Sequence, residues 1–312
     1  MSSPSLASLD LGSNTFRLLI AQTDSFGRGP INPKVWQEIP RLSENLIAGG
    51  PLASEPKKRA WAALEKFDSV IKELKPQKVL AGATMTFRLA HDGADFLEKI
   101  GSSFGWETKL LTGENEARLS ALGVLSALEP VPEHGLIFDI GGRSTEFIKT
   151  NHKNLAAIRS LPLGVVSLTS DYISADPPTQ AELADVSEAV TGVLTELAPE
   201  FVNPETVLIG TAGTVTTLAA MLLGLTDYDS ELVNNRVFSK NDLEKLFANL
   251  AGMPLNDRRL VPGLHPKRAD VICAGLMEVL AVMKFFNKPK LTVSDKSLLE
   301  GLWLAAGAFV PL

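Results

Sequence analysis

Residues 10–19 read Asp-Leu-Gly-Ser-Asn-Thr-Phe-Arg-Leu-Leu, a polar turn with a glycine between two apolar stretches. Short apolar stretches on both sides of such a turn predict a β-hairpin. The glycine lets backbone N–H groups approach an anion because no Cβ lies in the way, and hydroxyl and amide side chains add donors. The stretch therefore predicts a phosphate-binding turn made of Gly12, Ser13, Asn14 and Thr15.

A second copy of this pattern follows at residues 139–146, which read Asp-Ile-Gly-Gly-Arg-Ser-Thr-Glu. Asp10 and Gly12 of the first copy correspond to Asp139 and Gly141 of the second. A single turn of this kind is ordinary hairpin chemistry, whereas a matched pair in one chain indicates duplication. Neither copy is a P-loop or a dinucleotide fingerprint, since a strand rather than a helix follows each turn. The pair suggests two half-sites that bind one ligand.

The chain repeats one order of predicted elements: strand, strand, strand, helix, strand, helix. This repeat predicts an α/β fold of two related domains with a cleft between them. Because residues 129–132 read Glu-Pro-Val-Pro, we expect domains over residues 1–128 and 129–297, with a helix at about 298–312 packing back on the first domain. The predicted strands are 6–10, 16–21, 35–42, 78–84, 108–111, 135–140, 145–150, 155–161, 207–209 and 290–293, and the predicted helices are 54–74, 94–104, 112–128, 163–173, 180–200, 215–224, 240–251, 267–286 and 298–309.

The composition argues against several classes of partner. The chain has 312 residues and a formal net charge of −6, which argues against nonspecific nucleic-acid binding. Its most apolar stretch, 271–283, carries Glu278 and is too short to span a bilayer, so we expect no membrane partner. A lone cysteine, Cys273, rules out an internal disulfide, and the N-terminus shows no secretory signal. We therefore expect a cytoplasmic protein; a homodimer stays open because the sequence locates no apolar patch.

Acidic residues lie beside turns that otherwise attract anions, namely Asp10, Asp139 and Glu146. Carboxylates in these places fit a divalent cation between protein and phosphate, and Mg²⁺, which keeps several waters, is the typical ion. Stabilisation of the turn through its own backbone is the alternative for each aspartate. A further acidic residue, Glu116, lies in the first turn of the helix predicted from 112. It stabilises the helix dipole there and on these grounds needs no other role.

Five motifs resemble those of a known family. They read Asp-Leu-Gly-Ser-Asn-Thr-Phe-Arg at 10–17, Thr-Met-Thr-Phe-Arg-Leu-Ala at 84–90, Thr-Gly-Glu-Asn-Glu-Ala-Arg at 112–118, Asp-Ile-Gly-Gly-Arg-Ser-Thr-Glu at 139–146 and Gly-Thr-Ala-Gly-Thr at 210–214. In this order they closely resemble the exopolyphosphatase and guanosine pentaphosphate phosphohydrolase (Ppx/GppA) phosphatase family. That family belongs to the superfamily of actin, sugar kinases and chaperone ATPases. The resemblance, from residue 6 to about 304, therefore implies two actin-like (ribonuclease H-like) domains.

The resemblance implies hydrolysis of a terminal phosphoanhydride with water as the acceptor. Glu116 matches the second glutamate of the family's Glu-Glu-Ala-Arg stretch and would orient and deprotonate the water, while Asp139 and Glu146 match the family's metal and water ligands. The two turns would hold successive phosphates, and Arg88 would neutralise a phosphoryl oxygen. The implied phosphate-binding residues are Gly12, Ser13, Asn14, Thr15, Arg17, Arg88, Gly141, Gly142, Arg143, Ser144, Thr145, Gly210, Thr211, Gly213 and Thr214.

The sequence departs from the family pattern at two places. Arg143 stands where the family usually has a third small residue, so it either adds a phosphate contact or narrows the channel. Leu299 stands where the family often has the arginine of Leu-Arg-Glu-Gly, so one basic contact is missing or moved. Near the predicted helix 267–286, His265 is expected to be a cap or loop residue and Arg268 is a candidate ligand contact.

Three functions remain open on the sequence. The first is an exopolyphosphatase that acts on inorganic polyphosphate with Mg²⁺. The second is hydrolysis of guanosine pentaphosphate, and the chain's end near residue 312, without the helical extension of longer family members, keeps short substrates plausible. The third is an actin-fold module that binds a nucleotide without turnover. A sugar kinase is less well supported, because no aspartate has a setting that suggests a base for an alcohol acceptor.

Overall fold

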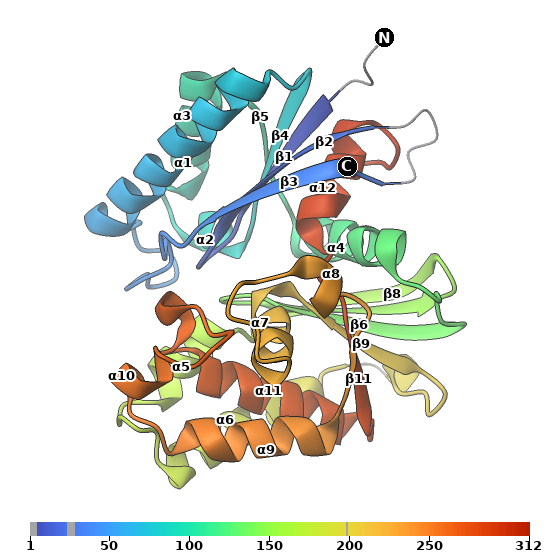
Figure 1. Cartoon of the computed structure of the whole chain (residues 1–312). Coiled ribbons are helices and arrows are strands. Elements are labelled where there is room, and N and C mark those ends of the chain that lie inside the picture. The colour runs from blue at the N-terminus through green and yellow to red at the C-terminus, as the bar shows by residue number, and fades with distance from the viewer. Residues whose placement is uncertain (1–4, 24–28, 198) are drawn as a thin grey trace. The chain divides into compact units, whose positions relative to one another are not determined.

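The computed structural model divides the chain into two compact units and describes residues 5–23, 29–197 and 199–312 (Figure 1). Unit 1 consists of Met1–Ala127 and Lys296–Leu312, and unit 2 of Leu128–Asp295. Part of the N-terminus judged to lack a secretory signal, and position 198 of the predicted helix 180–200, lie outside the described residues. None of the described helices is long and apolar enough to cross a bilayer.

Unit 1 is built on a five-stranded mixed sheet with the order β3-β2-β1-β4-β5. The two hairpin strands are antiparallel, and β1 is parallel to β4, which is parallel to β5. Six of the seven residues of β1 are buried, as expected for a strand covered on both faces. The strands are β1 (Ser5–Leu11), β2 (Phe16–Gln22), β3 (Ile31–Glu38), β4 (Lys78–Ala83) and β5 (Glu107–Leu110).

Helices cover both faces of this sheet (Figure 1). Alternate residues of β1 point to opposite faces. Leu9 packs in a core with α1 and α3, whereas Leu6 packs in a cluster with Trp303 of α12. The helices of unit 1 are α1 (Ser54–Leu74), α2 (Met85–Leu89), α3 (Gly93–Phe104), α4 (Gly113–Ala127) and α12 (Leu298–Ala306).

Two glycines let α4 and α12 cross at backbone contact. A Cβ on Gly301 would lie 1.9 Å from the carbonyl oxygen of Leu119, and a Cβ on Gly123 would lie 1.9 Å from that of Ser297. Real Cβ atoms do not approach so closely, so each helix lacks a side chain where the other passes. This crossing fixes α4, the helix that carries Glu116, against the sheet.

We expect Gly301→Ala to lower the free energy of unfolding by about 3 kcal/mol, because the added methyl forces two backbones apart. Gly192→Ala is the matched control. Gly192 lies in a helix with no atom within 4 Å of its Cβ position, so alanine there should be neutral or slightly stabilising. Urea unfolding of both variants measures the difference, and equal stabilities would contradict the close crossing.

Unit 2 is built on a second sheet with the order β10-β11-β9-β6-β7-β8. Taken from β8, it repeats the order of unit 1, with β6 in the place of β1 and β9 in the place of β4, and adds β10 at the edge. This repeat confirms the predicted α/β fold of two related domains. The strands are β6 (His134–Ile140), β7 (Thr145–Asn151), β8 (Asn154–Leu161), β9 (Val207–Thr211), β10 (Val237–Ser239) and β11 (Lys290–Val293).

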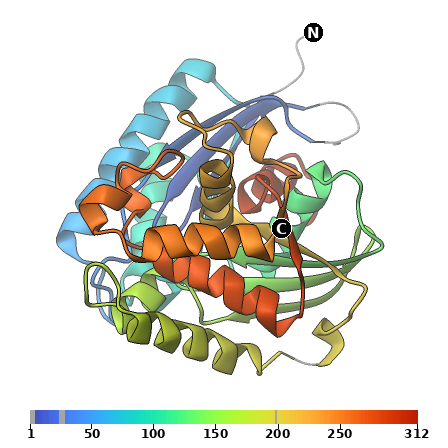
Figure 2. The same cartoon turned by 60° about the horizontal axis from the view of Figure 1, so that its bottom comes forward.

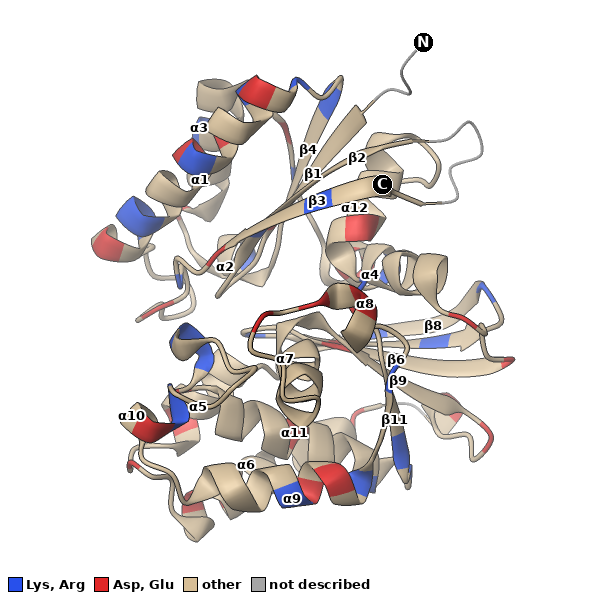
Figure 3. Ribbon diagram, in the orientation of Figure 1, with Lys and Arg blue, Asp and Glu red and all other residues tan. Residues whose placement is uncertain are grey.

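One face of this sheet packs on the apolar helix α11 (Ile272–Phe285) and its neighbours. Figure 2 shows α9 and α11 side by side, and in Figure 3 the ribbon of α9 mixes both signs of charge, as expected for an outer helix. The remaining helices of unit 2 are α5 (Val165–Tyr172), α6 (Gln180–Leu194), η1 (Pro199–Phe201), α7 (Ala212–Leu222), α8 (Ser230–Val233), α9 (Lys240–Ala251), α10 (Leu255–Arg258) and η2 (Pro266–Arg268).

Several predicted boundaries are wrong. The third strand covers Ile31–Glu38 rather than 35–42, because Pro40 cannot continue the ladder while an edge strand tolerates Pro33. Helix α7 begins at Ala212 rather than at 215. The predicted helix 267–286 is a 3₁₀ turn followed by a separate α11. The short elements α8, β10 and α10 were not predicted, since three or four residues carry no periodicity.

Candidate active site

The first glycine turn is a tight four-residue hairpin loop. The N–H of Gly12 donates to the carbonyl of Thr15 at 3.1 Å, and a Cβ on Gly12 would lie 2.8 Å from that oxygen. The N–H of Ser43 donates to the carbonyl of Ser13, so a loop beyond β3 braces the turn. Glycine is therefore required at position 12 for the shape of the turn.

Arg17 pairs with Asp10 across the hairpin and ties it to α12. Its Nη2 lies 2.8 Å from Asp10 Oδ2 and 2.9 Å from the hydroxyl of Ser297, which starts α12 in a capping box with Glu300. The sequence predicts that Asp10 binds a metal ion and that Arg17 binds phosphate. Because Asp10 Oδ2 accepts from a guanidinium, this carboxylate is a weaker candidate for a cation than a carboxylate without such a partner.

Glu116 lies at the start of α4 and is held by an arginine from α2. Arg88 Nη1 donates to Glu116 Oε2 at 2.9 Å and to the carbonyl of Leu111 at 2.5 Å, and Glu116 is 9% exposed. The hydroxyl of Thr112 accepts from the N–H of Asn115 at 3.1 Å and caps the helix as expected. The structure thus brings Arg88 and Glu116 together, and the guanidinium fixes the orientation of the carboxylate.

The second glycine turn repeats the geometry of the first. The N–H of Gly141 donates to the carbonyl of Ser144 at 2.9 Å, and a Cβ on Gly141 would lie 2.8 Å from that oxygen. The N–H groups of Val165 and Val166, in the first turn of α5, donate to the carbonyls of Gly141 and Gly142. The start of α5 therefore holds this turn in shape.

The cross-strand pair next to this turn consists of two carboxylates. Asp139 lies opposite Glu146 in the β6–β7 ladder, in the register that Asp10 and Arg17 occupy in unit 1. Asp139 is 9% exposed and Glu146 is 2% exposed. Two acidic side chains directly opposite each other are destabilising without a compensating positive charge. The hydroxyl of Ser160 donates to Glu146 Oε1 at 2.7 Å and orients it.

This donor set fits a magnesium ion. Mg²⁺ prefers oxygen ligands and is usually bound by one or two carboxylates together with waters and substrate phosphates. Among the described residues no group of three or more His, Cys, Asp or Glu side chains is placed to hold a metal. Asp139 and Glu146 would therefore hold the ion with waters and the substrate rather than in a cage made by the protein alone.

The Gly210–Thr214 motif forms the end of β9 and the start of α7. A Cβ on Gly210 would lie 2.9 Å from the ring of Phe138, and the Thr211 hydroxyl donates to the carbonyl of Ser294 at 3.0 Å. These two residues therefore shape the strand end, although the resemblance implied phosphate contacts for them. Ala212 has a φ of 69°, a strained backbone that L-residues rarely adopt and that often marks functional sites.

Gly213 makes room for an arginine at the N-terminus of α7. A Cβ on Gly213 would lie 1.8 Å from Arg268 Nη1, so the guanidinium occupies the space above this glycine. Thr214, also in the first turn, is buried. A guanidinium beside the positive end of a helix is a favourable place for a phosphate. Arg268, a candidate contact in the sequence, therefore joins the predicted residues Gly213 and Thr214.

Thr145, which follows the second turn, differs from its implied role. The Thr145 side chain is fully buried and its hydroxyl donates to Glu278 of α11 at 2.6 Å, so this hydroxyl faces the core instead of a ligand. Arg143 is half-buried. Burial lowers the pKa of its guanidinium, while the charge of Asp171 acts in the opposite direction. Arg143 is thus a cation in a partly apolar setting.

His265 and Leu299 are two other positions with an expectation from the sequence. His265 Nδ1 accepts a hydrogen bond from the N–H of Lys267, which confirms His265 as a cap. Burial is the main cause that lowers the pKa of His265, and the positive charge of Arg268 lowers it further. Leu299 is 1% exposed and packs in the same apolar cluster as Leu6 and Trp303. An apolar contact therefore replaces the arginine that the family often has at this position.

Two site residues were missed. Ser297 had a signal, because Ser-x-x-Glu at 297–300 is a capping-box pattern. Glu278 was noticed only as a charge in an apolar stretch, which could not reveal its contact with Thr145.

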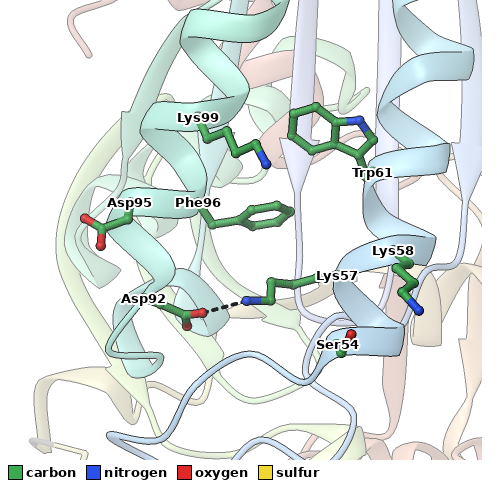
Figure 4. Close-up of a pocket in the computed structure, with 8 residues that line it drawn as sticks. All are labelled: Ser54, Lys57, Lys58, Trp61, Asp92, Asp95, Phe96 and Lys99. Carbon is green, nitrogen blue, oxygen red and sulfur yellow. Dashed lines mark hydrogen bonds and ion pairs between the residues drawn. The ribbon is translucent and has the colours of Figure 1, made fainter.

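A groove of about 420 Å³ lies between α1 and α3 in unit 1 (Figure 4). Its floor contains Trp61 and Phe96, and Lys99 Nζ lies 4.9 Å from the Trp61 ring. Lys57 donates to Asp92 at 2.9 Å across the groove, while Asp95 points away from it. Because no predicted site residue lines it, we assign this groove no part in the chemistry.

Comparisons with known proteins show which family this chain resembles along nearly its whole length. The model of the Ppx/GppA phosphatase family matches residues 36–306. A Mycobacterium tuberculosis protein named Exopolyphosphatase 2 is 30% identical over 316 residues, which cover 96% of this chain and 98% of that protein.

Solved structures of similar proteins share the whole fold. An Aquifex aeolicus member of the Ppx/GppA family is 29% identical and superposes with a TM-score of 0.83 over 98% of both chains. An exopolyphosphatase from Cytophaga hutchinsonii is 26% identical, with a TM-score of 0.87 over 97% of this chain and 98% of the other. These matches confirm the family recognised in the motifs, the fold, and an enzyme that hydrolyses phosphoanhydrides. With a family model over most of its length and relatives that match nearly all of it, the chain belongs to the Ppx/GppA phosphatase family.

Proposed function

We propose that the protein is an exopolyphosphatase that removes the terminal phosphate of inorganic polyphosphate with the help of Mg²⁺. The observation that carries the proposal is the carboxylate of Glu116, nearly buried at the start of α4 and held by Arg88 at 2.9 Å. A fixed carboxylate of this kind suits a general base that orients and deprotonates water. The similarity to a protein named Exopolyphosphatase 2 supports polyphosphate as the substrate.

Each turn has its own part in this reaction. The matched turns at Gly12 and Gly141 each bind phosphate through backbone N–H groups of the turn other than those of the two glycines, which close the turns. Gly213, Thr214 and Arg268 bind a further phosphate at the start of α7. These contacts fix the terminal phosphate for in-line attack, which is the main demand that phosphoryl transfer makes on a protein.

Different groups accept the proton of the attacking water and neutralise the charge of the phosphates. Glu116 accepts the proton of the attacking water, and Arg88 keeps the carboxylate in position and balances its charge. When bound, Mg²⁺ held by Asp139 and Glu146 would neutralise phosphate oxygens as the leaving phosphate gains charge. Ser160 keeps the Glu146 carboxylate oriented.

Release of phosphate from long-chain polyphosphate and from guanosine pentaphosphate, at equal concentrations with Mg²⁺, tests the proposal. We expect a larger kcat/KM for polyphosphate. Faster hydrolysis of guanosine pentaphosphate would assign the second activity that the family name covers. Saturable nucleotide binding in calorimetry without any phosphate release would instead identify a binding module and end the proposal.

A further inference from the structure

Glu278 is a carboxyl group in the middle of the apolar helix α11. It is completely buried, and the other buried residues of this helix are apolar. Taking an ionised carboxylate out of water is so costly that such groups are usually paired or held neutral. Burial raises the pKa of Glu278 to about 7, and the hydrogen bond from Thr145 acts in the opposite direction.

Glu278 connects α11 to the second glycine turn. Its Oε1 accepts from the hydroxyl of Thr145 at 2.6 Å, and the carbonyl of Leu163 lies 3.2 Å from the same hydroxyl. Its Oε2 has no hydrogen-bond partner among the described residues. Thr145 is the first residue of β7 after the turn, so the carboxyl is one side chain away from the backbone that the proposed function assigns to phosphate.

The elements packed against α11 present mostly apolar side chains to it. The exceptions are Arg258 of α10, which donates to Cys273 Sγ at 2.9 Å and also pairs with Asp176, and Thr214 of α7, which lies beside Gly275. Helices α5, α6, α7 and α9 contribute aliphatic residues to the shared core, and burial and Thr145 are the causes of the pKa shift. Asp139 and Glu146 point to the opposite face of the sheet from Thr145, because neighbouring strand residues alternate. In the turn, Arg143 has Asp171 as its charged neighbour. A charge on Glu278 therefore has no nearby cation to balance it among the described residues.

We propose that Glu278 is a positioning residue that holds Thr145 and the second glycine turn through the hydrogen bond from the Thr145 hydroxyl, and that the negative charge of its ionised form, beneath the turn, weakens binding of a polyphosphate chain. The inference rests on the proposed function for the identity of the anion. The raised pKa of Glu278 determines how the affinity for polyphosphate changes with pH. The carboxyl is neutral below about pH 7 and ionised above it, so affinity is highest on the acid side and falls as pH rises.

Binding of inorganic tripolyphosphate in calorimetry at pH 6 and pH 8.5 tests the inference. We expect the wild-type dissociation constant to rise about tenfold more over this range than that of Glu278→Gln, which keeps the shape and cannot ionise. Any ionisation of tripolyphosphate itself is common to both proteins and cancels in this ratio. Thr145→Ser, which keeps the hydroxyl, is the control and should show the wild-type dependence.

Unfolding in urea tests the ionisation of Glu278 independently of ligand binding, in case Glu278→Gln binds poorly because it misfolds. The raised pKa makes the native state hold a proton that the unfolded chain has released between about pH 4.5 and 7, so wild-type stability to urea should fall over this range and Glu278→Gln should show a smaller fall. Equal pH dependence of tripolyphosphate binding in the two proteins would overturn the inference. Absence of phosphate release, with the difference in binding intact, would refute only the proposed hydrolysis.

Discussion

Replacing Glu116 by Gln lowers kcat for phosphate release by about 10²- to 10⁴-fold and leaves polyphosphate binding nearly unchanged. The amide keeps the shape of the side chain, and its oxygen still accepts the hydrogen bond that Arg88 donates at 2.9 Å. What it loses is the capacity to take a proton from water. The loss therefore falls on kcat, whereas the contacts that bind the phosphates stay in place.

Glu114→Gln is the matched control for this variant. Glu114 lies in the same first turn of α4 and is exposed, so the change removes an equal charge near the helix N-terminus without touching the site. Steady-state phosphate release and calorimetric binding of both variants separate the two effects. A Glu116→Gln enzyme as fast as Glu114→Gln would mean that Glu116 only stabilises its helix.

Glu146→Gln raises the Mg²⁺ concentration needed for half-maximal activity by about 10- to 100-fold, and a chelator abolishes activity reversibly. Glu146 and Asp139 lie opposite each other and are largely buried, and carboxylate oxygens are the ligands that Mg²⁺ prefers. Removing one of them leaves a single carboxylate for the ion. Ser160→Ala, which only removes the hydrogen bond to Glu146, should shift the dependence in the same direction by less.

The contrasting variant in unit 1 is Asp10→Asn. Asp10 is paired with Arg17 at 2.8 Å, so its loss should unsettle the hairpin and lower stability while the Mg²⁺ dependence stays close to that of the wild type. Titration of activity with MgCl₂ measures all three variants. An equal shift for Asp10→Asn and Glu146→Gln would show that both aspartate turns share the ion, as the sequence alone had suggested.

Much of the fold could be predicted because local signals agree with the tertiary structure. Helix α1 has the predicted limits, since its apolar residues recur at helical spacing and the chain changes direction at Lys75 in the left-handed region. The duplicated hairpin was visible because a turn of this geometry needs glycine at both Gly12 and Gly141. The start of α7 was missed because Gly213 resembles loop chemistry, although it lies in the helix to make room for Arg268.

The pairing of the site residues was harder to predict. The hairpin register places Asp10 opposite Arg17 and Asp139 opposite Glu146, and a four-residue turn implies this register. By contrast, the contact between Arg88 and Glu116 joins two separate helices, and no spacing in the sequence encodes it.

Hydroxyl groups gave the least reliable signals. Thr145 and Thr211 look like phosphate ligands in the motifs, yet both donate to groups within the core. A threonine after a glycine turn can face a ligand or the interior of the protein. Its orientation depends on whether a hydrogen-bond acceptor lies nearby in the core, and the local sequence does not show this.

The most direct test of the account is a crystal structure of the Glu116→Gln variant with Mg²⁺ and tripolyphosphate. The account predicts phosphates bound by the turns that begin at Gly12 and Gly141, and the amide of residue 116 within about 3 Å of a water in line with the terminal phosphate. Tripolyphosphate bound by one turn alone, or in the groove between α1 and α3, would contradict it.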